Sequence, residues 1–287
     1  MNAILEVKNL TKHYNTFSLN NVNLAIPKGS IVGLIGENGA GKTTTIKAMI
    51  GAIHKDGGEV TLFGKPFDVA NKDVMQQIAI VMEGSFFHEE LSPKQMAKVL
   101  KGLYKKWNQA TFERYLQQFK LPLTKKLKEF SKGMRMKLSI AIALSYDAKL
   151  LILDEPTSGL DPIVRSEILN IFQDFIIDEE RSILLSSHIT TDLEKIADYI
   201  AFMHNGRVIL HETKDDLIYK YGIVKCSEQQ FAKLDPTHVI GFEKGAFSVQ
   251  ALVNDKQKVQ RAYPGLTIDS PTIEDIMLYY VRGEKND

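Results

Sequence analysis

The stretch Gly36-Glu37-Asn38-Gly39-Ala40-Gly41-Lys42-Thr43 decides how the rest of this sequence is interpreted. It fits the pattern Gly-x-x-x-x-Gly-Lys-Thr, and it lies between an apolar run at 30–35, typical of a strand, and a run at 44–50, typical of a helix. Glycines let successive backbone N–H groups turn toward phosphate oxygens, and the helix that follows adds the positive end of its dipole. The stretch therefore predicts a loop that binds the phosphates of a nucleotide.

The residues of this loop have separate expected roles. The Lys42 ammonium neutralises the β- and γ-phosphates, and the Thr43 hydroxyl is a ligand for magnesium. The nucleotide contacts are expected from Gly36, Asn38, Gly39, Gly41, Lys42, Thr43 and Thr44. The loop by itself does not indicate what the nucleotide drives.

Composition limits the classes of protein that fit. The 287 residues are enough for one large core and a small additional domain. No apolar run approaches the roughly 20 residues that span a bilayer, and the N-terminus lacks a signal-peptide pattern, so we expect a cytoplasmic protein. The single cysteine, Cys226, excludes an internal disulfide, and a net charge of +1 argues against a nucleic-acid binder.

Charged and polar residues end two apolar runs. Asp154 and Glu155 follow the run at 149–153, and His188 follows the run at 182–187. In a doubly wound parallel sheet, ligands bind at the carboxyl ends of the strands. We therefore expect Asp154 to hold magnesium, Glu155 to accept a proton from an attacking water, and His188 to reach the γ-phosphate.

The segment 92–145 is helical and unusually basic. Ser92 and Pro93 open a helix, and between residues 94 and 128 there are ten Lys or Arg against one acid, Glu113. Such a run is usually a solvated helical face; the alternative is contact with anionic lipid headgroups. Farther on, Ser131 can cap a helix and Gly133 permits close approach of a backbone, so an anion could dock there.

The order of these motifs resembles the nucleotide-binding subunit of an ATP-binding-cassette (ABC) transporter. The similarity covers about residues 3–215 and rests on the stretches 36–43, 131–134, 150–155 and 158–161 and on His188. It implies an α/β fold: a phosphate-loop NTPase (RecA-like) core with an antiparallel β subdomain and a helical subdomain at about 85–145. We place this nucleotide-binding domain at 1–218 and a small C-terminal α+β domain at 219–287.

The resemblance also implies residue roles for ATP and magnesium. Tyr14, otherwise a packing residue, stacks on adenine; Ser131 and Gly133 contact the γ-phosphate of the opposite subunit; and Asp161 lines the dimer interface. Two positions depart from the family. The signature is Phe130-Ser131-Lys132-Gly133-Met134 in place of Leu-Ser-Gly-Gly-Gln, and Glu83 stands for the usual glutamine as a magnesium ligand.

The C-terminal part resembles that of bacterial exporters whose ATPase and permease are separate chains. We expect a ferredoxin-like order of strand, helix, two strands, helix and strand from residue 222 on, followed by a helix after Pro271. Phe86 and Phe87 either line the groove that receives the permease or are ordinary core residues. No nucleic-acid partner is expected.

The resemblance therefore implies an ATP-hydrolysing subunit, peripheral on the inner face of the cell membrane, with Lys42, Glu155 and His188 catalytic. It pairs with a second ATP-binding subunit, the same or a related chain, and powers a permease that exports drugs, peptides or other amphipathic compounds. The alternative is an ABC ATPase that acts on ribosomes or DNA; those usually carry two cassettes or a long coiled coil. A phosphate-loop kinase or GTPase is a third hypothesis, which the Ser-x-Gly-Met element disfavours.

Overall fold

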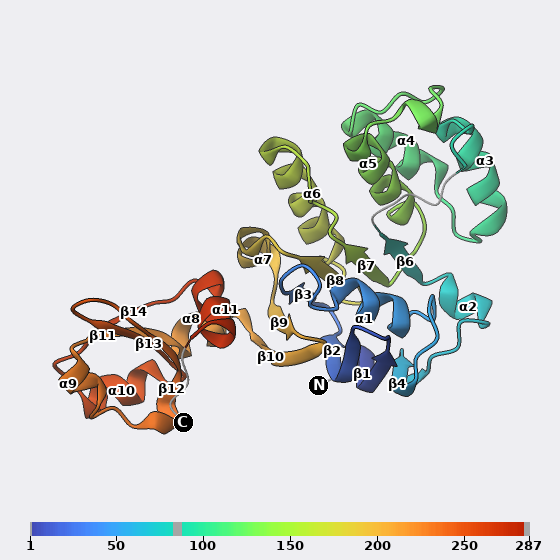
Figure 1. Cartoon of the computed structure of the whole chain (residues 1–287). Helices are drawn as coiled ribbons and strands as arrows, with labels where there is room; N and C mark the ends of the chain where they lie inside the picture. The colour runs from blue at the N-terminus through green and yellow to red at the C-terminus, as the bar shows by residue number, and fades with distance from the viewer. Residues whose placement is uncertain (1, 83–87, 284–287) are drawn as a thin grey trace.

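The central sheet has six strands and carries the nucleotide motifs. The computed structural model describes residues 2–82 and 88–283 (Figure 1). The strands of this sheet, in the order β10-β9-β3-β8-β7-β6, are β3 (Ile31–Ile35), β6 (Ile78–Val81), β7 (Leu150–Asp154), β8 (Ser182–Ser187), β9 (Tyr199–His204) and β10 (Arg207–Thr213). All neighbours are parallel except β10, which returns antiparallel to β9.

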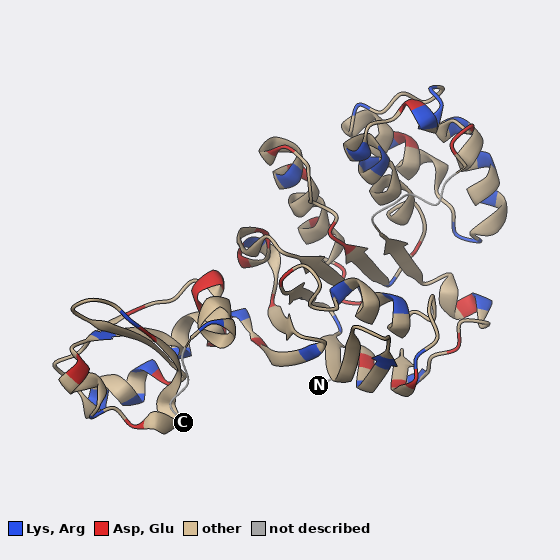
Figure 2. Ribbon diagram, in the orientation of Figure 1, with Lys and Arg blue, Asp and Glu red and all other residues tan. Residues whose placement is uncertain are grey.

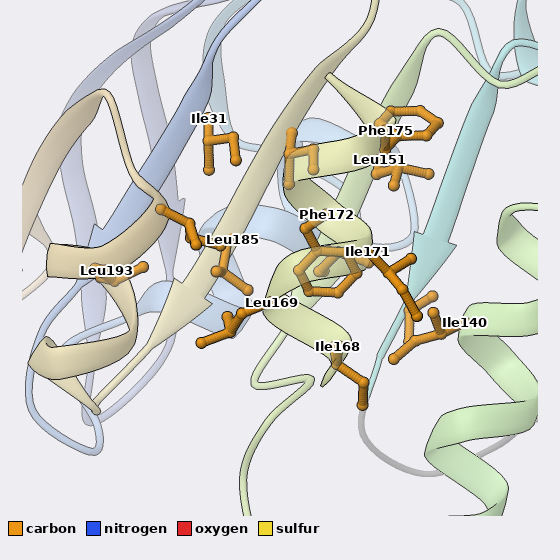
Figure 3. Close-up of a cluster of buried hydrophobic side chains, with 14 of the residues drawn as sticks. Ile31, Ile140, Leu151, Ile168, Leu169, Ile171, Phe172, Phe175, Leu185 and Leu193 are labelled. Atoms are coloured by element: carbon orange, nitrogen blue, oxygen red, sulfur yellow. The ribbon is translucent and has the colours of Figure 1, made fainter. Parts of the chain in front are cut away.

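Helices cover both faces of this sheet, which is why its strands read as continuous apolar runs. Leu151 of β7 packs with Phe172 of α6 (Pro162–Phe175), a contact region drawn in Figure 3. The next residue along, Ile152, belongs to the opposite core with Ile46 of α1 (Lys42–Met49). Successive residues thus face different cores, and a strand with one polar face would not fit here.

A second sheet of four antiparallel strands lies beside the first. Its order is β2-β1-β4-β5, with β1 (Ala3–His13), β2 (Ser18–Pro27), β4 (Gly57–Leu62) and β5 (Lys65–Pro66). The sequence Asp56-Gly57-Gly58-Glu59 predicts a turn, but this prediction is wrong, because Gly57 pairs with Thr11 and already belongs to β4. Gly58, at φ 88°, lies so close to the Asn9 carbonyl that a side chain would not fit, so the glycines serve an irregularity in the strand rather than a turn.

The helical segment forms a separate group in Figure 1. It contains α3 (Pro93–Leu103), α4 (Gln109–Gln118), η1 (Leu127–Glu129) and α5 (Lys132–Ala143), and α2 (Lys72–Met75) precedes β6. The helix start expected at Ser92-Pro93 is confirmed: Ser92 and Gln95 form a capping box with Pro93 as the first helical residue.

Lysines and arginines are spread over this segment (Figure 2). Four of the ten cations counted between 94 and 128 form ion pairs: Lys105 with Asp73, Lys106 with Asp147, and Lys126 and Lys128 with Glu90. Hydrogen bonds from Lys126 and Lys128 lower the pKa of Glu90 to about 2. These pairs agree with a solvated face; contact with lipid headgroups stays a hypothesis.

The C-terminal part follows α7 (Thr190–Ile196), the β9–β10 hairpin and α8 (Lys214–Lys220). Its elements are β11 (Gly222–Cys226), α9 (Glu228–Phe231), η2 (Pro236–His238), β12 (Val239–Lys244), β13 (Val249–Val253), α10 (Lys256–Ala262), β14 (Thr267–Asp269) and α11 (Ile273–Val281). The antiparallel sheet has the order β12-β13-β11-β14, and the succession of strands and helices agrees with the expected one. The division of the chain near residue 218 stays a prediction.

Within residues 2–82 and 88–283, no helix has the length and apolar character needed to cross a membrane.

Candidate functional site

The phosphate loop joins the end of β3 to the start of α1, and its glycines are required by its shape. A Cβ on Gly36 would overlap the Met203 carbonyl oxygen, and one on Gly41 would lie 2.8 Å from Cζ of Phe17. Gly41 has φ 111° and occupies the N-cap position of α1 without a side-chain cap. The N–H groups at the start of α1 therefore have no competing side chain, as a phosphate site needs.

Lys42 is held at the centre of the loop. Its side chain is buried, and its Nζ donates to the carbonyl oxygens of Gly36 at 2.7 Å and Glu37 at 3.3 Å. The same Nζ lies 3.4 Å from Oε1 of Glu155. The loop thus fixes the Lys42 ammonium group beside the carboxylate of Glu155, which follows β7.

Asp154 lies at the end of β7, behind the loop, with both oxygens accepting hydrogen bonds. Thr43 Oγ1 donates to Oδ2 at 2.7 Å, and Ser186 Oγ donates to Oδ1 at 2.5 Å. The carboxylate is buried, so these bonds offset part of the cost of removing it from water. Ser186, which sequence reasoning missed, connects β8 to this carboxylate.

Glu155 and His188 meet at the mouth of the site. Glu155 has φ 51°, in the left-handed region that is unfavourable for a residue with a side chain, and its N–H donates to Ser186 Oγ at 3.1 Å. His188 Nδ1 lies 2.7 Å from Oε2 of Glu155. A carboxylate only accepts, so Nδ1 carries the proton and Nε2 is left as the ring nitrogen for a ligand.

Lys42, Glu155 and His188 line a cavity of about 530 Å³. The residues lining it are Phe17, Glu37, Asn38, Gly39, Gly41, Lys42, Thr43, Thr44, Glu155, Ser158 and His188. Phe17, Glu37 and Ser158 were not predicted. Phe17 sits on the same β1–β2 turn as Tyr14, and its aromatic character was the available signal.

Other predicted residues lie outside this lining. Tyr14 is half exposed, with Lys12 Nζ 5.4 Å from its ring centre. Ser131 caps α5, accepting from the Met134 N–H at 3.2 Å, and Asp161 caps α6, accepting from the Val164 N–H at 3.1 Å. The roles of these residues stay predictions.

Gly133 also lies outside the lining; a Cβ added there would be 3.1 Å from Leu160. Gly36 and Asp154 sit behind the cavity rather than in its wall. Glu83, Phe86 and Phe87 lie outside the described residues, so their predicted roles are untested.

Comparison with known proteins indicates the family of this chain. A family model described as ABC transporter matches residues 19–158. The chain is 38% identical over 223 residues to the lantibiotic transport ATP-binding protein SrtF of Streptococcus pyogenes, with 74% of this chain and 92% of that protein covered. It is 35% identical over 212 residues to the bacitracin transport ATP-binding protein BcrA of Enterococcus faecalis, covering 73% of this chain and 69% of the relative.

A solved structure supports the same assignment. The chain superposes on an ATP-binding subunit of an ABC transporter with a TM-score of 0.65 and 32% identity, covering 80% of this chain and 93% of the other. The phosphate loop, the carboxylates at the end of β7 and these relatives together show that the chain belongs to the ABC transporter family, as an ATP-binding subunit that hydrolyses ATP.

Proposed function

We propose that this chain powers a peptide exporter from the cytoplasmic side of the membrane, closing on ATP together with a second ATP-binding subunit. The observation that carries the catalytic part is the contact of Glu155 with both Lys42 and His188 at the cavity wall. The substrate class follows the relatives, which are transport proteins for a lantibiotic and for bacitracin.

Glu155 is the proposed general base. Its carboxylate pairs with Lys42 at 3.4 Å and with His188 at 2.7 Å. A γ-phosphate at the loop competes with Glu155 for the Lys42 ammonium, which leaves the carboxylate oriented by His188 and able to accept a proton from water. Nε2 of His188 then faces the phosphate as a hydrogen-bond donor or acceptor.

Thr43 and Asp154 are the proposed holders of magnesium. Their oxygens are 2.7 Å apart, and hydroxyl and carboxylate oxygens suit this ion. In the described parts of the chain no three His, Cys, Asp or Glu side chains form a metal-binding group. Magnesium usually takes only one or two carboxylates and fills the rest of its shell with water and phosphate oxygens. Bound magnesium would neutralise charge on the β- and γ-phosphates.

Ser131 and Gly133 are proposed to act on the nucleotide of a second subunit. Neither residue is among the described residues that line the cavity of their own chain. Ser131 is the N-cap of α5, and the N-terminus of a helix attracts anions. A head-to-tail pair would bring this terminus to the partner's phosphate loop.

The permease is proposed to dock in an apolar cavity of about 640 Å³ between β6, α3 and α5. Its walls include Ile80, Met82, Leu100, Leu103, Tyr104 and Ile142. Leu103, in this wall, is 60% exposed, so part of the apolar lining is open to a partner.

The test replaces Glu155 by glutamine. Glu155→Gln should bind ATP and form the closed pair, while hydrolysis falls about 10²- to 10⁴-fold, because the amide cannot accept the proton. Nucleotide binding and steady-state ATPase rate give the two readouts. Glu167→Gln, an exposed residue of α6, is the matched control and should hydrolyse ATP normally. Near-normal hydrolysis by Glu155→Gln would remove Glu155 as the base.

A further inference from the structure

The last helix, α11, is built into the nucleotide-binding part of the chain. Its buried residues Ile273, Ile276 and Tyr279 belong to the same core as Phe202 of β9 and Leu185 of β8. Tyr280 of α11 packs edge-on against Phe202, with ring centres 6.4 Å apart. The helix therefore packs into the core that covers the central sheet.

The start of α11 is fixed to the helix that follows His188. The Ile273 N–H donates to Oε1 of Glu194, on α7, at 3.0 Å. Thr272 and Asp275 form a capping box that defines the first turn. The capping box and the bond to Glu194 fix the start of α11, and its buried residues fix the face that packs on the core. Together these contacts determine the direction of the helix.

The end of α11 brings a cation to the phosphate loop. Arg282, its C-cap residue, places Nη2 3.9 Å from Oε1 of Glu37. Glu37 lines the nucleotide cavity, and its carbonyl oxygen accepts from Lys42. An acidic side chain at this wall repels the phosphates of ATP, so a neighbouring guanidinium reduces the repulsion.

We propose that Arg282 is a positioning residue through which the C-terminal part of the chain raises the affinity of the site for ATP, by offsetting the charge of Glu37. The inference rests on this cavity being the ATP site. Since the two side chains are 69% and 45% exposed, the effect is that of a surface pair, about two- to fivefold in Kd, and salt should screen it.

The experiment measures binding of a non-hydrolysable ATP analogue to the full chain. Arg282→Ala should raise Kd about two- to fivefold at low ionic strength and little at high ionic strength. Arg282→Lys should retain most of the affinity, and the kcat at saturating ATP should be unchanged. Arg261→Ala, an exposed cation of α10, is the matched control and should bind as the unaltered chain does.

The decisive arm uses Glu37→Gln as background. Whatever that change does alone, adding Arg282→Ala to it should cause no further loss, because the charge to be offset is gone. An undiminished loss in that background, or an Arg282→Ala chain with unchanged Kd, overturns the proposal. If the unaltered chain does not bind the analogue at all, the assignment of the site fails instead.

Discussion

Single side chains connect the strands of the candidate site. Ser186 donates to Asp154 and accepts from the N–H of Glu155, so one hydroxyl on β8 holds both residues at the end of β7. Glu155 also adopts φ 51°, and a residue in that conformation persists only when its surroundings determine it. The hydroxyl of Ser186 thus fixes the positions of both acidic residues.

Ser186→Ala should lower stability by about 1–3 kcal/mol and activity by about 10- to 100-fold, because buried Asp154 loses a donor and Glu155 loses its anchor. Denaturant unfolding and the ATPase rate are the measurements. Ser182→Ala, at a buried serine of the same strand that bonds Gly29 and Pro27 instead, should lose stability with little loss of rate. Equal rate losses in the two variants would mean that Ser186 has no special role.

His211, on β10, makes stability depend on pH. Burial lowers its pKa below the ordinary value, and its ring meets Tyr199 edge-on at 6.2 Å. The unfolded chain therefore binds the proton more readily, and stability present above the unfolded pKa, about 6.5, is lost as pH falls toward the folded pKa. His211→Gln should lose less stability than the unaltered chain between pH 7.5 and 5.5 in urea unfolding. An identical pH profile would contradict this.

At the scale of elements, the N-cap residue of α5 has two expected roles. Ser131 caps the helix and is proposed to meet the γ-phosphate bound by a second subunit. Asp and Asn both cap helices about as well as Ser, so either keeps the fold, but only Asp brings a negative charge to the phosphate.

The free energy of unfolding of Ser131→Asp should therefore lie within about 1 kcal/mol of that of the unaltered chain, yet this variant should fail to dimerise when ATP is added. Ser131→Asn is the neutral control and should pair better than the aspartate variant. Thermal unfolding and light scattering with ATP in the Glu155→Gln background are the measurements. If the aspartate variant dimerises as strongly as the asparagine variant, the proposed contact of Ser131 with the γ-phosphate is contradicted.

At the scale of the whole molecule, one cluster of buried residues joins the C-terminal part to the central sheet. Leu252 and Ile276 belong to one cluster with Leu210 and Leu217, whereas Val259 belongs to a separate cluster inside the C-terminal part. Truncating a buried side chain of either cluster leaves a cavity. Only the first cluster lies between the C-terminal part and the central sheet. Trp107, the single tryptophan, lies in the helical segment and reports on the nucleotide-binding part.

Ile276→Ala should lower the free energy of unfolding followed by Trp107 fluorescence by about 2–5 kcal/mol, the usual cost of such a cavity. Val259→Ala is matched in being buried within the C-terminal part alone, and it should change the Trp107 signal less. A Trp107 transition unmoved by Ile276→Ala would show that the two parts unfold independently.

Much of the fold follows from local patterns. The apolar runs at 30–35, 149–153 and 182–187 predicted β3, β7 and β8, because strands covered on both faces are apolar throughout. The sequence did not reveal the length of β1 or the role of Gly58 within β4. Those depend on an irregularity between Lys8 and Thr11 of β1, which arises only when β1 pairs with β4 and brings Gly58 against Asn9.

The sequence by itself determined the phosphate loop and the carboxylates at the end of β7, since both are written in contiguous residues whose spacing has a direct physical meaning. Only the tertiary structure decided that Ser186 joins Asp154 to Glu155, that Phe17 lines the cavity and that Arg282 lies beside Glu37. These contacts join residues far apart in the chain, and no local pattern encodes which distant side chains a folded sheet brings together.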